Sequence, residues 1–141
     1  GSAIAASLAA AGVGELMLFD TRDESAQALA GRLAAYYPRM KVGTGSRDPQ
    51  GFDVVVNATP LGMKDDDPLP FDVQRIAPTT FVGEVVMKSE FTPLLRAVRD
   101  KGCDFQVGTD MLFEMIPAYL EFFGFGSATP DELRATAHIS Y

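Results

Sequence analysis

The chain reads Phe52-Asp53-Val54-Val55-Val56-Asn57-Ala58-Thr59-Pro60 at its clearest strand. Three consecutive valines are typical of a strand that is buried on both faces of a parallel sheet. The residues from Asn57 to Pro60 have the composition of a turn that leaves the strand. Shorter apolar runs predict further strands at 16–19, 41–43, 81–87 and 105–107.

Amphipathic segments between these strands predict helices. Apolar residues recur every three or four positions from 24 to 36, and Pro38 ends this run. Four more helices are predicted at 3–11, 93–101, 111–123 and 130–137, the third with Pro117 inside it. Strands that alternate with helices favour an α/β fold, with a doubly wound, mainly parallel sheet and helices on both of its faces.

Composition and net charge disfavour several classes of function. The chain has 141 residues, 47% of them hydrophobic, which is enough for the core of a single globular unit. Its net charge of -7 disfavours nucleic acids and anionic membranes as partners. No apolar run reaches the roughly 20 residues of a membrane span, so we expect a cytoplasmic protein. Cys103 is the only cysteine, which excludes an internal disulfide and predicts a buried small hydrophobe.

Neither a metal site nor a catalytic residue is predicted from local patterns. Asp65, Asp66 and Asp67 lie beside prolines in a predicted loop over 64–70 and lack partners at the spacing of metal ligands. His138 is the only histidine and lies near the end of the chain, so we expect an exposed side chain. Ser2 has no histidine nearby that could activate it as a nucleophile.

Polar or small residues follow four of the predicted strands. Ligands of parallel sheets bind beyond the carboxyl ends of the strands. The four groups, at 20–22, 57–60, 84–87 and 108–111, are therefore expected to line one crevice.

The first of these groups, Asp20-Thr21-Arg22, suggests a reader of a nucleotide ribose. A carboxylate can accept hydrogen bonds from both free ribose hydroxyls and favours NAD, whereas an arginine can pair with a 2′-phosphate and favours NADP. Because the chain has both groups, the choice between NAD and NADP stays open. A plain turn is the alternative interpretation, since Thr21 and Glu24 have the spacing of a helix capping box.

Residues 54–63, Val54-Val55-Val56-Asn57-Ala58-Thr59-Pro60-Leu61-Gly62-Met63, resemble the shikimate and quinate dehydrogenase family. Three more segments are similar to that family in the same order: 1–5 to the tail of its glycine-rich loop, 92–95 to its post-strand helix, and 108–112 to its nicotinamide-side turn. The resemblance implies a Rossmann-like NAD(P)-binding domain over 1–124 with a helical tail at 125–141. It also implies that the first strand and the amino-terminal substrate domain are missing from this chain.

The function that the resemblance implies is oxidoreduction. The family transfers a hydride reversibly between NADP or NAD and shikimate, or a related cyclohexane carboxylic acid, in aromatic amino acid biosynthesis. Its catalytic lysine and aspartate belong to the substrate domain, so no catalytic residue is expected here and the chain alone is expected to be inactive. A second copy of the chain, forming a homodimer, is a candidate partner.

The implied cofactor-binding residues are Gly1, Ser2, Asp20, Thr21, Arg22, Asn57, Ala58, Thr59, Pro60, Val85, Gly108, Met111 and Leu112. Backbone amides at Gly1 and Ser2 would hold the pyrophosphate. The turn at 58–60 would pass under the cofactor, with Asn57 bonding backbone beside it. Glycine at 108 would let the main chain approach the nicotinamide carboxamide.

Some positions depart from the family's pattern. Met87 and Met115 stand where the family commonly has a tyrosine and a glutamine that reach the substrate, and a thioether donates no hydrogen bond. This implies a different or less hydroxylated substrate. Residues 20–22 stand where the family usually has asparagine, arginine and threonine or serine. Glu84 replaces its usual aspartate, and we expect it to bond backbone.

Two other functions are considered. The two methionines also fit a non-catalytic module that senses a nucleotide or metabolite on the same fold, because fold does not fix function. A methyltransferase would use Asp20 for a ribose in the same way, but residues 57–63 do not resemble that class.

Overall fold

The computed structural model describes residues 1–64 and 66–139. The chain divides into two compact units, Gly1–Asp48 and Pro49–Tyr141. This division lies elsewhere than the boundary at residue 124 that the resemblance implies, and that boundary stays a prediction.

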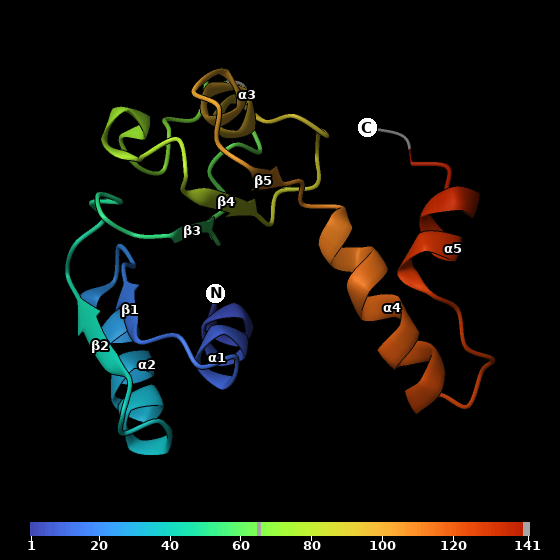
Figure 1. The fold of residues 1–141 in the computed structure, drawn as a ribbon, viewed down its shortest axis with the longest axis horizontal. Helices are drawn as coiled ribbons and strands as arrows, with labels where there is room; N and C mark the ends of the chain where they lie inside the picture. The colour runs from blue at the N-terminus through green and yellow to red at the C-terminus, as the bar shows by residue number, and fades with distance from the viewer. Residues whose placement is uncertain (65, 140–141) are drawn as a thin grey trace. The chain divides into compact units, whose positions relative to one another are not determined.

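The first unit contains two parallel strands and two helices (Figure 1). Its elements are α1 (Ser2–Ala10), β1 (Glu15–Leu18), α2 (Asp23–Tyr36) and β2 (Lys41–Thr44). Glu15 lies opposite Lys41 in the parallel ladder, and their side chains form an exposed ion pair of 2.9 Å. All four elements lie where the sequence predicts them, to within one residue at each end.

The core of this unit is small. Ala5 and Ala9 of α1 and Leu33 of α2 are buried together. Leu16 and Leu18 of β1 pack against this cluster, as alternate residues of one strand face must. Small side chains let α1 pack closely against the other residues of this core, which explains the run of alanines in the helix.

The second unit contains a three-stranded parallel sheet. Its elements are β3 (Val54–Asn57), the 3₁₀ helix η1 (Val73–Arg75), β4 (Phe81–Glu84), α3 (Pro93–Asp100), β5 (Phe105–Gln106), α4 (Asp110–Phe122) and α5 (Pro130–Thr136). The strands lie in the order β3-β4-β5. The predicted strands at 81–87 and 105–107 end three residues and one residue early, and η1 was not predicted. The parallel strands and interspersed helices confirm the predicted α/β class.

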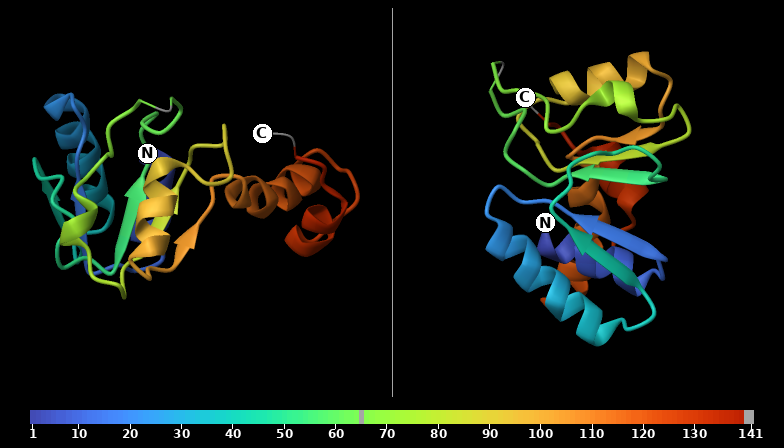
Figure 2. Two further views of the ribbon diagram at one scale, coloured as in Figure 1. Left: turned by 90° about the horizontal axis from the view of Figure 1, so that it is seen from above. Right: turned by 90° about the vertical axis from the view of Figure 1, so that its left-hand side faces the viewer.

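Helix α3 and η1 cover one face of this sheet (Figure 2). Leu94, Leu95 and Val98 of α3 are buried in one cluster with Val82 of β4. Thr92 caps α3 by accepting a 3.2 Å bond from the amide of Leu95. Among the described residues, β3 pairs with β4 alone, so β3 is an edge strand, and the side chain of Val54 on it is 43% exposed.

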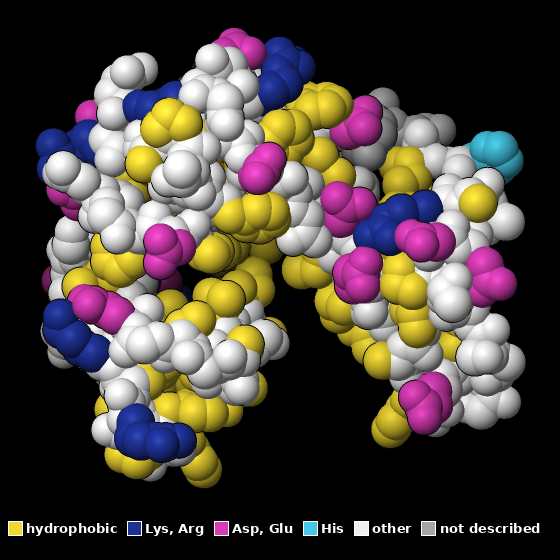
Figure 3. Space-filling model, viewed as in Figure 1, with side chains coloured by type: hydrophobic (Ala, Val, Ile, Leu, Met, Phe, Trp, Pro, Cys, Tyr) yellow, Lys and Arg dark blue, Asp and Glu magenta, His cyan; other side chains and the backbone are white. Residues whose placement is uncertain are grey.

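Helices α4 and α5 contact each other in the same unit. The Arg134 guanidinium on α5 bonds Asp110, Glu114 and Asp131, and Figure 3 shows a basic side chain among acidic ones over these helices. Hydrophobic side chains also gather along α4 in Figure 3. The exposed ones include Leu112, Met115, Tyr119 and Phe122.

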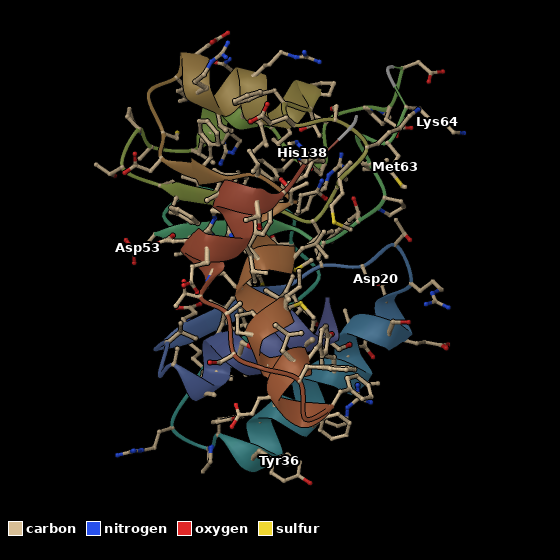
Figure 4. The ribbon with its side chains drawn as sticks, turned by 90° about the vertical axis from the view of Figure 1, so that its right-hand side faces the viewer. Asp20, Tyr36, Asp53, Met63, Lys64 and His138 are labelled. Atoms are coloured by element: carbon tan, nitrogen blue, oxygen red, sulfur yellow. The ribbon has the colours of Figure 1, made fainter. Side chains whose placement is uncertain are left out.

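The structure also bears on the predictions for Cys103, His138 and the aspartates at 65–67. Cys103 is buried, and burial raises the pKa of its thiol. His138 is exposed beyond α5 (Figure 4). Asp65 lies outside the described residues, and no group of potential metal ligands occurs among residues 1–64 and 66–139. Within the same ranges, no helix is long and apolar enough to cross a membrane.

Candidate functional site

Asn57 organises the turn that follows β3. Its side chain is 2% exposed, and its Oδ1 atom accepts bonds from the backbone amide of Thr59 (3.1 Å) and from the Thr59 hydroxyl (2.7 Å). Its Nδ2 atom donates to the carbonyl of Leu61 at 3.0 Å. Asn57 therefore bonds backbone at the end of the strand, as the sequence predicts.

Glu84 ends β4 beside this turn and is 4% exposed. One carboxylate oxygen accepts a bond from Asn57 Nδ2, and the other accepts a bond from the hydroxyl of Thr92. We expected Glu84 to bond backbone, but its hydrogen-bond partners are side chains. The reason is that Asn57 and Thr92, which are distant in sequence, meet at the carboxyl edge of the sheet.

A pocket of about 360 Å³ opens beside these buried groups. Two walls form it, one from the segment after β3 and one from the segment after β4. The lining residues are Ala58, Thr59, Pro60, Met63, Val85, Val86, Met87 and Lys88. Most of these side chains are apolar, and Lys88 is the charged one. The pocket therefore suits a flat, mainly apolar group with a polar or anionic neighbour.

Asp67 holds the loop that contains Met63 by accepting hydrogen bonds from its backbone. Asp67 Oδ2 accepts bonds from the backbone amides of Gly62 and Lys64, each at 3.0 Å. The bond from Lys64 lowers the pKa of the Asp67 carboxyl below its usual value, and the bond from Gly62 adds to this effect. Figure 4 shows Met63 and Lys64 on this loop. The Met63 wall of the pocket is thus tied to a carboxylate.

Gly108 packs the turn after β5 against the turn after β4. A Cβ atom at this position would lie 2.1 Å from the carbonyl oxygen of Val86, a distance that no side chain can occupy. We expected this glycine to let the main chain approach a nicotinamide carboxamide. The structure shows a separate reason for glycine here, the close approach of two stretches of the protein's own backbone, and the approach to the cofactor stays a prediction.

The remaining predicted site residues of this unit lie on α4. Met111 is half-buried in the first turn, Leu112 is 41% exposed, and Met115 is 39% exposed one turn later. None of them lines the pocket. Met87, the other predicted substrate-side residue, does line it.

Asp20, Thr21 and Arg22 belong to the first unit, between β1 and α2 (Figure 4). Asp20 Oδ1 accepts a 2.9 Å bond from the backbone amide of Arg22. The predicted capping box of Thr21 and Glu24 is wrong, because Arg22 is the N-cap residue of α2 and no side chain caps the helix. Asp20 satisfies the Arg22 amide in the turn that precedes the helix.

Gly1 and Ser2 lie at the start of α1, where Gly1 is the N-cap residue. Both residues are exposed. An anion can bind the backbone amides at the start of a helix because the first amides of a helix lack partners within the helix.

Sequence reasoning missed several residues around the pocket. Met63 and Lys88 line it, and Thr92 completes the contacts of Glu84. Met63 ends the recognised motif and Lys88 follows Met87, so position in the chain was an available signal for both. Thr92 was recognised only as the start of a helix.

Two known proteins align with almost the whole of this chain. A shikimate dehydrogenase (NADP+) of Rhodospirillum rubrum is 35% identical over 138 residues, which cover 94% of this chain and 49% of that protein. A quinate/shikimate dehydrogenase (NAD+) of Corynebacterium efficiens is 34% identical over an alignment of 142 residues that covers 96% of this chain and 50% of that protein. The chain belongs to the shikimate and quinate dehydrogenase family.

The fold agrees with this family. Quinate dehydrogenase of Corynebacterium glutamicum, solved in complex with NAD, superposes with a TM-score of 0.83 at 34% identity. The superposition covers 96% of this chain and 50% of that structure. No protein-family model matches the chain. Because each match covers about half of the matched protein, the chain spans about half the length of these dehydrogenases.

Proposed function

We propose that this chain is the NAD(P)-binding domain of a shikimate/quinate-type dehydrogenase. The whole enzyme would transfer a hydride reversibly between NADP or NAD and shikimate, or a related cyclohexane carboxylic acid. The observation that supports this most directly is the apolar pocket at the carboxyl ends of β3 and β4. Its position agrees with the general rule for ligands of parallel sheets.

The pocket fits the nicotinamide end of such a cofactor. Its volume of about 360 Å³ lies in the range of about 300 to 1,000 Å³ that is usual for small-molecule sites. Apolar walls on two sides suit a planar ring. When bound, the nicotinamide ring would supply or accept the hydride.

The chain's own residues would bind and orient the cofactor. The walls at 58–60 and at 85–87 would fix which face of the ring is presented and would exclude water from it. The predicted contribution of Met111 and Leu112 is a further apolar surface on α4. Backbone amides at Gly1 and Ser2 would hold the pyrophosphate, and residues 20–22 would read the adenosine ribose.

The substrate would meet this pocket on the side of Met87. This side chain is 42% exposed and lines the pocket, and its thioether donates no hydrogen bond. Each polar contact that Met87 and Met115 fail to make would weaken the binding of a hydroxylated ring by about 1 kcal/mol. We therefore propose a less hydroxylated acid as the preferred substrate.

Turnover by the intact protein tests the proposal. Shikimate, quinate and analogues that lack one or more hydroxyls would be supplied with NAD or NADP, and reduction of the cofactor would be followed by absorbance. We expect oxidation of at least one acid, and no turnover by residues 1–141 alone. The absence of turnover across this panel with both cofactors would contradict the enzyme assignment.

A sensing module is the second candidate function, because Met87 puts an apolar group where the pocket would meet a polar ring. Such a protein would bind a dinucleotide or an acid without converting it. Calorimetric binding together with an absence of turnover would favour this function over the first.

We also propose a domain organisation, a cellular location and an oligomeric state for the protein. Residues 1–124 would form the domain and 125–141 its helical tail, in a cytosolic protein. A homodimer is supported by the exposed Tyr119, Phe122 and Phe123 at the end of α4. Analytical ultracentrifugation of the intact protein, with and without Phe122→Ser, tests the dimer, which the substitution should weaken.

A further inference from the structure

The carboxylate of Glu84 lies directly behind the pocket. Glu84 precedes Val85, which begins one pocket wall, and its partner Asn57 precedes Ala58, which begins the other. The two residues are also neighbours in the parallel ladder of β3 and β4. The buried side-chain contact between Asn57 and Glu84 therefore joins the bases of both walls, beside a 3.2 Å backbone bond from the Val85 amide to the Asn57 carbonyl.

The second oxygen of Glu84 reaches a third element. It accepts a hydrogen bond from the hydroxyl of Thr92, which is fully buried and whose Oγ1 atom also caps α3 at Leu95. The carboxylate thus connects the ends of two strands to the start of the helix that packs on them. No other side-chain partner of Glu84 occurs in the described part of the chain, and no ion pair neutralises it there.

Gly62 completes the enclosure. A Cβ atom on Gly62 would lie 3.6 Å from Thr92 Cβ and 3.8 Å from Glu84 Oε1, so the backbone of the pocket loop covers the carboxylate. The φ angle of Gly62 is +101°, which a side chain would rarely adopt. Met63, the next residue, lines the pocket.

We propose that Glu84 is a positioning residue for the nicotinamide pocket. One carboxylate oxygen joins the walls at 58–63 and 85–88 through Asn57, the other fixes them to the start of α3 through Thr92, and together they hold the walls at a fixed separation. The inference rests on the proposed function, because it assigns to Glu84 the geometry of a dinucleotide site. Glu84 itself does not line the pocket, so it acts through Asn57 and the two walls.

Glu84→Gln changes this arrangement with little change in size. An amide keeps one acceptor and replaces the other with a donor, so it cannot accept from both Asn57 and Thr92. One buried donor is then left without its acceptor, so either the side-chain contact between the two walls or the contact to the start of α3 is lost. We expect the dinucleotide to bind about tenfold more weakly.

The experiment compares the binding of dinucleotides with that of ADP in the intact protein. Calorimetry would measure NAD, NADP and ADP, since ADP lacks the nicotinamide ring, and circular dichroism would verify folding. The matched control is Asp72→Asn, which alters an exposed carboxylate that accepts a 2.9 Å bond from the amide of Gln74 at η1, outside the pocket lining. We expect Glu84→Gln to weaken dinucleotide binding and to leave ADP binding within about twofold, and Asp72→Asn to change neither.

Equal dinucleotide affinity in wild type and Glu84→Gln, or an equal loss for ADP and dinucleotide, would overturn the assignment. Should Glu84→Gln fail to fold, Thr92→Val removes the second donor while Thr92→Ser keeps it. Weaker dinucleotide binding in the valine variant alone supports the proposal, and equal binding in both overturns it. A wild-type protein that binds no dinucleotide would instead contradict the proposed function itself.

Discussion

The turn after β1 and the turn after β3 both follow parallel strands, but they are held in different ways. In the first unit, Asp20 bonds only the amide of Arg22, two residues away, and Arg22 is exposed. In the second unit, Asn57 bonds its own turn and also Glu84, which lies 27 residues further along the chain. We therefore expect a substitution in the first turn to affect folding little and a substitution of Asn57 in the second turn to affect it more.

The largest effect is expected from Gly108→Ala in the second unit. The added Cβ would lie 2.1 Å from the Val86 carbonyl, and a backbone atom cannot rotate away as a side chain can. We expect a loss of more than about 3 kcal/mol in the free energy of unfolding, measured by urea denaturation.

The matched control is Gly126→Ala, because nothing lies within 4 Å of a Cβ there. It should change the free energy of unfolding by less than about 0.5 kcal/mol. Similar values for the two variants would show that the backbone at 108 can move aside.

Asn57→Ala should produce the next largest effect. It leaves Glu84 without one donor and frees the Thr59 and Leu61 groups that Asn57 bonds. Unfolding should become easier by about 2 to 3 kcal/mol in the same denaturation experiment. A cost as small as that of Asp20→Asn would remove the distinction between the two turns.

Asp20→Asn should leave stability within about 0.5 kcal/mol but should change cofactor preference. The asparagine removes a negative charge that would repel a 2′-phosphate, while Arg22 remains to pair with it. We expect the ratio of NADP to NAD affinity to rise about tenfold in calorimetric titrations of the intact protein. An unchanged ratio would exclude Asp20 from the ribose site.

The smallest effect concerns the acid titration of Asp67. Hydrogen bonds lower its pKa in the folded state, so its contribution to stability is present above the unfolded value near 3.8 and is lost as pH falls through the folded pKa. The amide NMR signals of Gly62 and Lys64 should therefore titrate with a midpoint below 3.8. Asp67→Asn should abolish this titration.

Sequence patterns predicted most elements of the fold because their signals are local. The valines of β3, the Thr92-Pro93 start of α3 and the Thr129 to Glu132 capping box of α5 each lie within a few residues. The 3₁₀ helix at 73–75 is a single turn and has no period that a pattern could reveal. The Thr21 and Glu24 spacing was present, but α2 begins one residue later than a box at these positions requires, with Arg22 as its N-cap residue.

The candidate site was predicted only in part. The resemblance identified Ala58, Thr59, Pro60, Val85 and Met87, all of which line the pocket. The role of Glu84 depends on two partners at sequence separations of 27 and 8 residues, which no local pattern reveals. Gly108 was recognised as a glycine that permits close approach, but its neighbour proved to be the carbonyl of Val86.

The edge strand β3 has a practical consequence for handling the protein. Backbone groups along its unpaired side, together with three valines of which Val54 is 43% exposed, form a template for pairing with a strand of another molecule. Residues 1–141 produced by themselves should therefore aggregate as concentration rises. A lysine in place of Val54 should raise their solubility limit, since a charge on an edge strand opposes such intermolecular pairing.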